Sequence, residues 1–260
     1  RMGHQETYLH NESYAEFLDN WDESFYAKYA DNLMPATGSG KVLDVGCGTG
    51  QVIRRLKEKS IHAFGVDVSQ PNIERAKKIS DTCSLYDGKK LPFEEDEFDS
   101  AGALNVLEHV EQPEDFIKEI IRVVKPGGKV ILSSPNFYRV VGFRDYHPRM
   151  RGVLNKFMNA RRLQEKKRGI RDEPENVRFD RMTPIIKEPF SPDDDAIVAT
   201  NTLELEFFLS RYGCRIRSVS CTDRYVSPPI NWLLNLTSLR FLMFNSFIVA
   251  EKKAAEGPLT

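Results

Sequence analysis

The feature that most constrains this chain is a glycine-rich segment at residues 41–50, Lys-Val-Leu-Asp-Val-Gly-Cys-Gly-Thr-Gly. A short apolar run ends in an acid, three glycines follow at alternate positions, and residues 51–56 then show helical spacing. This order predicts a buried strand, a tight turn and the start of a helix. Glycine permits positive φ and close approach of a ligand, and the helix N-terminus offers unpaired N–H groups. The segment therefore predicts a site for a nucleotide-like ligand.

Three glycine patterns compete for this segment. A dinucleotide fingerprint, Gly-x-Gly-x-x-Gly, requires its third glycine where this chain has Gln51. A phosphate-binding P-loop requires Gly-Lys-Ser/Thr after a strand, but Gly40-Lys41 precedes the strand and Val42 follows it. The third pattern is acid-x-Gly-x-Gly-x-Gly, and it is met by Asp44, Gly46, Gly48 and Gly50. A glycine-rich turn that binds nothing is the remaining alternative.

Further positions, in the expected order, strengthen the third pattern. Residues 61–67 predict a second strand that ends in Asp67, where a carboxylate can accept hydrogen bonds from both hydroxyls of a ribose. Residues 85–99 contain an aspartate four residues before Leu-Pro-Phe, then an acidic turn and Phe-Asp. Residues 105–110 read Asn-Val-Leu-Glu-His-Val, and Lys-Pro-Gly-Gly at 125–128 ends a helix before an apolar strand.

Together these motifs resemble class I S-adenosylmethionine-dependent methyltransferases of the small-molecule type, methyltransferase domain 11-like. The resemblance is firm over residues 41–136 and loose over residues 202–252. It implies S-adenosyl-L-methionine as the cofactor. It also implies an α/β fold, with a doubly wound, Rossmann-like, seven-stranded sheet whose last strand is antiparallel.

The same resemblance assigns roles to individual residues. Asp67 would bind the ribose, Asp87 the adenine amino group and Asn105 the methionine part of the cofactor. Gly88 stands where relatives often have alanine, and Asp87 taken alone would be read as a turn residue. The predicted cofactor-binding set is Asp44, Gly46, Cys47, Gly48, Gly50, Asp67, Val68, Asp87, Gly88 and Asn105.

The chain of 260 residues suits one α/β domain with elaborations. We divide it into four parts along the sequence. These are an N-terminal helical lid at 1–36, the cofactor-binding core at 37–136, an insertion after the fifth strand at 137–200 that shapes the acceptor site, and the C-terminal part of the core sheet at 201–254.

Aromatic side chains gather before the glycine-rich segment, where a helix is predicted between residues 8 and 34. Tyr14, Phe17, Trp21 and Phe25 share one face of it. This stripe either packs on the domain or forms a lid over the cofactor and acceptor. Candidate acceptor-binding residues are Tyr14, Trp21, Tyr26, His109 and Tyr146.

The insertion carries a local excess of positive charge. Residues 149–181 hold 11 basic and 5 acidic side chains. Such a surface could bind phosphate, a nucleotide-linked sugar, anionic lipid or RNA, although a solvated helix face is the commoner explanation. The basic run at 161–168 contains no aromatic side chain, which weakens the case for single-stranded nucleic acid.

After the insertion, Asn201 is predicted to cap a helix that Gly213 ends, and a sixth strand and a last antiparallel strand (245–252) follow. Between these strands, residues 230–244 are unusually apolar. A helix there would pack on the sheet or, alternatively, form a pocket or interfacial surface for a lipid-like acceptor. Peripheral contact with lipid is therefore one expectation.

Composition excludes several classes of function. The chain has 37 basic and 38 acidic residues, so no nucleic-acid partner is expected. Its four cysteines form no Cys-x-x-Cys pair, so neither a zinc site nor a disulfide framework is predicted, and no metal ligand is assigned. No leader pattern and no apolar run of about 18 residues is seen, which predicts a cytoplasmic protein.

We expect methyl transfer to an oxygen or nitrogen atom, less readily carbon, of a small molecule, glycan precursor or lipid-like acceptor. An oxygen acceptor requires a general base, and His109 and His147 are weak candidates for it. An RNA or protein methyltransferase is an alternative, but Asn-Pro-Pro-aromatic is missing after the fourth strand. A non-catalytic scaffold that retains the cofactor fold is another.

Overall fold

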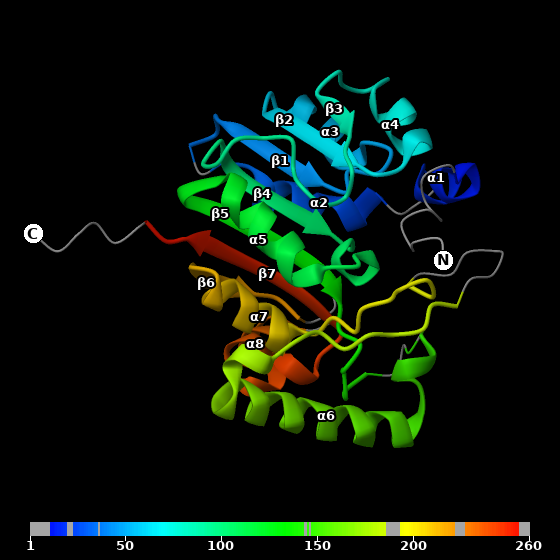
Figure 1. Cartoon of the computed structure of the whole chain (residues 1–260), viewed down its shortest axis with the longest axis vertical. Helices are drawn as coiled ribbons and strands as arrows, with labels where there is room; N and C mark the ends of the chain where they lie inside the picture. Colours follow the sequence, from blue (N-terminus) through cyan, green and yellow to red (C-terminus); the bar gives the residue numbers. More distant parts are fainter. Residues whose placement is uncertain are drawn as a thin grey trace, which may run out of the picture.

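A seven-stranded sheet runs through the centre of the molecule in the computed structural model, which describes residues 11–19, 23–35, 37–142, 145, 147–185, 193–221 and 227–254 (Figure 1). The strand order is β3-β2-β1-β4-β5-β7-β6. The strands are β1 (Lys41–Val45), β2 (His62–Asp67), β3 (Cys83–Leu85), β4 (Phe98–Leu104), β5 (Val124–Pro135), β6 (Cys214–Val219) and β7 (Asn245–Lys252). Six strands run in the same direction, whereas β7 pairs antiparallel with both β5 and β6, which confirms the predicted fold class.

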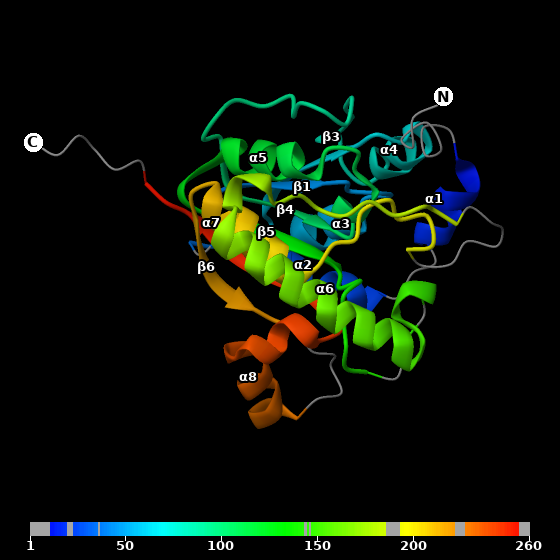
Figure 2. The ribbon, with the colours of Figure 1, turned by 60° about the horizontal axis from the view of Figure 1, so that its bottom comes forward.

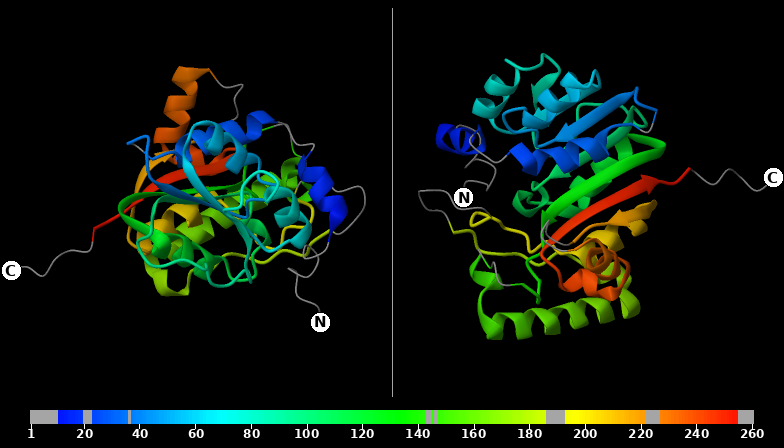
Figure 3. Two further views of the ribbon diagram at one scale, coloured as in Figure 1. Left: turned by 90° about the horizontal axis from the view of Figure 1, so that it is seen from above. Right: turned by 180° about the vertical axis from the view of Figure 1, so that it is seen from behind.

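Helices cover both faces of this sheet (Figures 1 and 3). They are α1 (Glu12–Asp19), α2 (Glu23–Leu33), α3 (Gln51–Glu58), α4 (Gln70–Ala76), α5 (Pro113–Val123), α6 (Gly152–Asp172), α7 (Thr202–Arg211) and α8 (Pro228–Leu236). Short 3-10 turns are η2 (Leu107–His109), η3 (Pro148–Met150), η4 (Pro174–Asn176) and η5 (Ser238–Leu242).

Successive residues of the central strands face opposite sides, so the sheet separates two cores. Leu43 belongs to the core under α5 and α7, whereas its neighbour Val42 belongs to the core under α2 and α3. Leu132 and Ile131 of β5 divide in the same way. Because both faces are buried, the strands are continuous apolar runs, as the sequence indicated.

The C-terminal elements follow their local signals. The Asn201 side chain accepts a hydrogen bond from the Glu204 N–H (3.0 Å) and so caps α7, as predicted. The segment between β5 and α7 adds α6, which lies alongside α7 (Figure 2). A third apolar cluster, centred on Phe137, Tyr138 and Leu163, fills the space beneath α6.

Two expectations about helices were wrong. The N-terminal segment forms two helices, α1 and α2, instead of one, so the predicted single aromatic stripe is divided between them. The apolar helix before β7 does not pack on the sheet: all nine residues of α8 are exposed or half-buried, and Trp232 is 66% exposed (Figure 2). An unbroken apolar run predicts burial only where a second surface is available to cover it.

Candidate functional site

The glycine loop lies at the carboxyl edge of the sheet, where β1 ends and α3 begins. Gly46, Gly48 and Gly50 have φ values of 77°, 53° and 88°. The N–H groups of Gly46 and Cys47 both donate to the Val66 carbonyl (2.7 and 3.0 Å), which holds the loop against the end of β2. A Cβ on Gly46 would lie 2.4 Å from Val106 Cγ2. Glycine is therefore required there both for its backbone angle and for space.

Asp44, the acid of the motif, is buried directly below this loop. The Tyr29 hydroxyl, from α2, donates to its Oδ1 atom (3.0 Å). Burial raises the pKa of Asp44 to about 7 and the charge of Asp67 acts in the same direction, while the Tyr29 hydrogen bond opposes them. Tyr29 was not singled out from the sequence, because its position in the aromatic N-terminal segment does not show that it reaches β1.

Asp67 ends β2 and connects the glycine loop to α4. Its Oδ2 atom accepts a hydrogen bond from the Gly48 N–H (2.9 Å), and its Oδ1 atom accepts from the Ser69 N–H (2.8 Å) and from Asn72 Nδ2 (3.3 Å). Burial raises the pKa of this carboxyl, although these hydrogen bonds favour its ionised form. A carboxylate has about four lone-pair sites, so three protein donors leave capacity for a ligand hydroxyl.

Asp87 lies in an exposed turn beyond β3. Its Oδ1 atom accepts hydrogen bonds from the N–H groups of Lys89 and Lys90 (2.8 and 3.0 Å), and these bonds lower the pKa of Asp87. Gly88 has φ of 75°, which explains physically why this chain has glycine at that position. The turn is close to Asp67, since the Tyr86 N–H donates to the Asp67 carbonyl (3.1 Å).

Asn105 follows β4 directly, in the left-handed region with φ of 52°. Asparagine tolerates this region better than most residues. Its N–H donates to the Ser133 carbonyl (2.8 Å), and the Ser133 hydroxyl donates to its Oδ1 atom (3.4 Å). The next residue, Val106, is the one that faces Gly46. The loop after β4 and the glycine loop are therefore neighbours, as the motif order predicted.

Helix α1 lies over the glycine loop, beside α4 (Figures 1 and 3). A Cβ on Gly48 would lie 3.2 Å from Leu18 Cδ1. Arg75 of α4 pairs with Glu12 (3.1 Å) and Asp19 (2.7 Å) at the two ends of this helix. Ion pairs of this kind stabilise a contact only weakly, so the buried Ala15 contributes more to holding α1 in place.

The other end of α1 meets the loop after β4 and the end of the insertion. Burial is the main reason why the pKa of Tyr14 is raised, and the negative charges of Asp195, Asp67 and Glu108 add to it. His109 lies among the same acids: its Nδ1 atom is 3.7 Å from Asp195 Oδ2, and its Nε2 atom is 3.9 Å from Glu108 Oε1. The structure thus brings Tyr14 and His109, two sequence-predicted residues, into one region.

The other predicted catalytic and acceptor-binding residues are His147, Tyr26, Trp21 and Tyr146. His147 is buried at the start of η3, where its Nδ1 atom accepts a hydrogen bond from the Arg149 N–H (3.2 Å) and its ring packs edge-on against Phe137. Burial lowers its pKa. Tyr26 is half-buried, and its hydroxyl donates to the Leu18 carbonyl (3.4 Å). Trp21 and Tyr146 lie outside the described residues.

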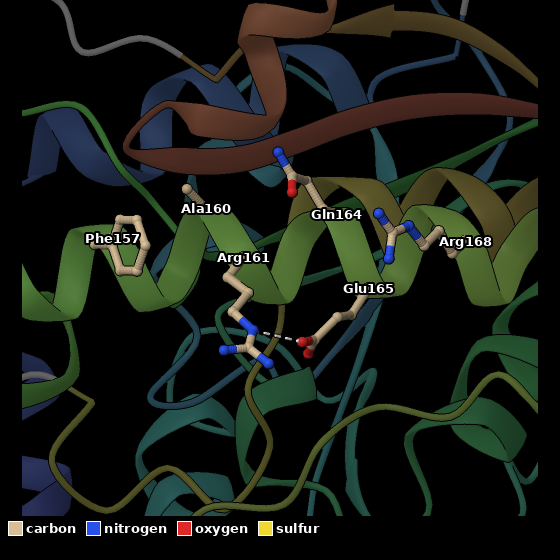
Figure 4. Close-up of a pocket in the computed structure, with 6 residues that line it drawn as sticks. All are labelled: Phe157, Ala160, Arg161, Gln164, Glu165 and Arg168. Carbon is tan, nitrogen blue, oxygen red and sulfur yellow. Dashed lines mark hydrogen bonds and ion pairs between the residues drawn. The ribbon is translucent and has the colours of Figure 1, made fainter.

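A separate hollow lies on the outer face of α6 (Figure 4). Its lining residues all come from this one helix: Phe157, Ala160, Arg161, Gln164, Glu165 and Arg168. Arg161 pairs with Glu165 (2.9 Å). Lys166, the next residue of the helix, pairs with Asp180 and Glu204 (2.7 Å each). Part of the basic charge of the insertion is therefore neutralised within the protein.

The four cysteines are all free and buried. Among the residues that the structure describes, no helix has both the length and the apolar character needed to cross a bilayer.

Comparison with known proteins places this geometry in a family. Residues 43–132 match a family model described as a methyltransferase domain. An uncharacterised protein of Methanocaldococcus jannaschii is 34% identical over 125 residues, which are 47% of this chain and 59% of the relative. A ubiquinone biosynthesis O-methyltransferase of Dechloromonas aromatica is 37% identical over 103 residues, 37% of this chain and 44% of the relative. The chain thus spans about half the length of these curated relatives.

Among solved structures, an S-adenosylmethionine-dependent methyltransferase from Mesorhizobium loti has a TM-score of 0.57, with 17% identity over 90% of this chain and 100% of the other. At that identity the likeness shows the fold. The family match identifies residues 43–132 as a methyltransferase domain, and the strand order and this likeness show the fold of class I S-adenosylmethionine-dependent methyltransferases.

Proposed function

We propose that this chain is an S-adenosylmethionine-dependent methyltransferase that acts on an oxygen or nitrogen atom of a small molecule, a glycan precursor or a lipid-like acceptor. The observation that carries the proposal is the glycine loop, whose three glycines all have positive φ beside the two buried acids Asp44 and Asp67. Bare backbone next to carboxylates fits a ligand that combines a ribose with a positively charged sulfonium and ammonium.

The cofactor would lie across the carboxyl edge of the sheet. The loop backbone from Gly46 to Gly50 would contact the methionine and ribose portions, with Asp67 at the ribose. Asp87 would accept a hydrogen bond from the adenine amino group and Asn105 would contact the methionine end. Cys47, Val68 and Gly88 would line the same surface. The side chain of Cys47 supports the turn, since a Cβ on Gly65 would lie only 2.8 Å from its sulfur.

The acceptor would bind between α1 and the end of the insertion. Leu18 contacts the glycine loop, and the charge of Asp195 acts on the hydroxyl of Tyr14. We therefore assign residues 1–36 as a lid and residues 137–200 as the part that shapes the acceptor site. Opening of this lid would allow exchange of cofactor and product.

S-adenosylmethionine supplies a methyl group that is already activated by its sulfonium. The protein then needs to hold the acceptor atom in line and to exclude water, and such positioning supplies much of the rate enhancement. For a hydroxyl acceptor, His109 is the better placed of the two histidines to take the proton. It lies between Glu108 and Asp195, and either carboxylate would stabilise the charged imidazolium.

The relatives favour an oxygen acceptor, because one of them is named as an O-methyltransferase. The exposed apolar face of α8 supports a lipid-like acceptor or peripheral contact with lipid. The four free thiols fit a reducing, cytoplasmic setting.

Transfer of a radiolabelled methyl group tests this function. The full chain is incubated with labelled S-adenosylmethionine and, separately, with pools of small molecules, lipid extracts, RNA and protein. We expect label in the small-molecule or lipid pool, and we expect the Gly46→Ala variant to lose it. Label confined to RNA or protein would contradict the acceptor class. Tight cofactor binding without transfer to any pool would favour a non-catalytic scaffold.

A further inference from the structure

The buried carboxylate of Glu108 has only a long contact to a possible counter-charge, since its Oε1 atom lies 3.9 Å from the Nε2 atom of His109. The residue is fully buried in η2, and neither of its carboxylate oxygens has a hydrogen-bond partner among the residues that the structure describes. Buried polar atoms in native proteins are nearly always satisfied, so such a group requires an explanation. Its position is nevertheless firmly fixed, because its backbone carbonyl accepts hydrogen bonds from the N–H groups of Ile197 and Val198 (2.9 and 3.0 Å).

Other potential metal ligands surround this carboxylate. Glu108, His109 and Asp193 each offer one ligand atom, and these three atoms lie within 4.8 Å of one another. They come from two segments far apart in the sequence, the loop after β4 and the turn at the end of the insertion. Asp195, in the same turn, lies 3.7 Å from the Nδ1 atom of His109.

The negative charges around Glu108 favour binding of a positive ion. The carboxylates of Asp193 and Asp195 lie close enough to act on the buried, negatively charged side chain of Glu108. The nearby Tyr14 is affected by the same acids. These carboxylates repel one another, and water does not screen the repulsion at the buried Glu108. A bound cation would replace this repulsion with attraction.

We propose that Glu108, His109 and Asp193 bind one divalent metal ion beside the acceptor site. Two carboxylate oxygens and an imidazole nitrogen suit Mn²⁺ or Zn²⁺. Two donors at about 2.1 Å from one ion lie at most about 4.2 Å apart, so small side-chain rotations complete the set. The Nε2 atom of His109 faces Glu108 while its Nδ1 atom faces Asp195, an orientation in which Asp195 would hold the ring of a ligating histidine.

Three protein ligands leave coordination positions open. Because the ion would occupy the Nε2 lone pair of His109, this histidine would hold the ion in the metal-bound protein and would not act as the general base. An acceptor oxygen could occupy one of them, next to the predicted methionine end of the cofactor at Asn105. This role in orienting the acceptor rests on the proposed function, whereas binding of the metal ion does not. The sequence analysis assigned no metal ligand, because Asp193 is distant from the Glu-His pair along the chain and no Cys-x-x-Cys pair occurs.

Binding of Mn²⁺ to the metal-stripped full chain tests the proposal, with free Mn²⁺ measured by electron paramagnetic resonance. Mn²⁺ is chosen because the four thiols compete for it poorly. We expect saturable binding of one ion per chain. The Glu108→Gln variant should weaken it at least about tenfold, and Asp193→Asn should do the same; Asp193 is only half-buried, so this variant guards against misfolding at Glu108.

Glu58→Gln is the matched control, because it removes the same charge from the exposed end of α3. It should leave Mn²⁺ binding unchanged. Absence of saturable binding, or equal binding by the wild type and both site variants, would overturn the proposal and leave protonation of Glu108 as the explanation. Titration with S-adenosylmethionine is run in parallel. Loss of cofactor binding with intact Mn²⁺ binding would reject the proposed function and retain the metal site.

Discussion

The two halves of the site are built in different ways. On the cofactor side, residues 41–105 shape the site with main chain: glycines at positive φ, N–H groups donated to Asp67, and the Val66 carbonyl. On the proposed acceptor side, between α1, η2 and residues 193–200, side chains from distant segments meet, many of them charged and buried. Backbone geometry leaves a local signature in sequence, whereas side-chain clusters across the fold do not.

The largest effect on cofactor affinity is expected from a substitution at Gly46, in the cofactor half of the site. The Gly46→Ala substitution places a methyl group against Val106 at a positive φ, so affinity for S-adenosylmethionine should fall more than about a hundredfold, as measured by calorimetry. Val106→Ala in the same chain removes the clash and should restore part of the affinity.

Gly38→Ala is the matched control for Gly46→Ala. Gly38 also has positive φ (70°), but a Cβ there meets nothing within 4 Å. It should cost about 1 kcal/mol of stability and leave cofactor affinity unchanged. Equal losses of affinity in the two variants would show that backbone strain, and not space at the loop, is decisive.

The next effect concerns the insertion, outside both halves of the site. Lys166 of α6 pairs with Asp180 and with the fully buried Glu204, and burial raises the pKa of Glu204 to about 7. Lys166→Met should lower the free energy of unfolding by about 3 kcal/mol, because a buried carboxylate loses its partner. Denaturant titration measures this change, and cofactor affinity should stay within about twofold.

A double variant sharpens this test. Combining Lys166→Met with Glu204→Gln should recover part of the lost stability, since the unpaired charge is removed as well. No coupling between the two substitutions in a double-mutant cycle would mean that the ion pair does not connect α6 to α7.

A smaller effect concerns pH. Because the pKa of Asp44 is raised to about 7, folded protein retains a proton there below that pH. A cationic cofactor favours the ionised carboxylate, so affinity should rise about tenfold from about pH 6 to about pH 8 and then level off. Calorimetry at several pH values measures this rise. The Asp44→Asn variant should not show this rise in affinity. A variant that keeps the wild-type pH profile would show that another group causes the rise.

The smallest expected effect is on α8. Trp232→Ala removes an exposed side chain, so the free energy of unfolding should change by less than about 0.5 kcal/mol. Binding to phospholipid vesicles, measured by sedimentation, should weaken if α8 contacts lipid. A large loss of stability would show that Trp232 is covered by another surface in solution.

The glycine loop and the sheet around it were predicted from the sequence. The three glycines follow from a local rule on turns, whereas the antiparallel β7 was implied by the family resemblance. Long-range partners were missed, because nothing in the residue spacing shows that Tyr29 reaches Asp44 or that Asp193 reaches Glu108. The wrong expectations for the N-terminal helix and α8 also concern contacts between surfaces. The periodicity of a sequence carries no information about those contacts.

The most direct test of the account is a crystal structure of the full chain grown with saturating S-adenosylhomocysteine. The account predicts ligand density lying flat along the main chain of residues 46–50, with the ribose hydroxyls on Asp67 and the adenine amino group at Asp87. Density at another edge of the sheet, or a glycine loop filled by the protein's own side chains, would contradict it.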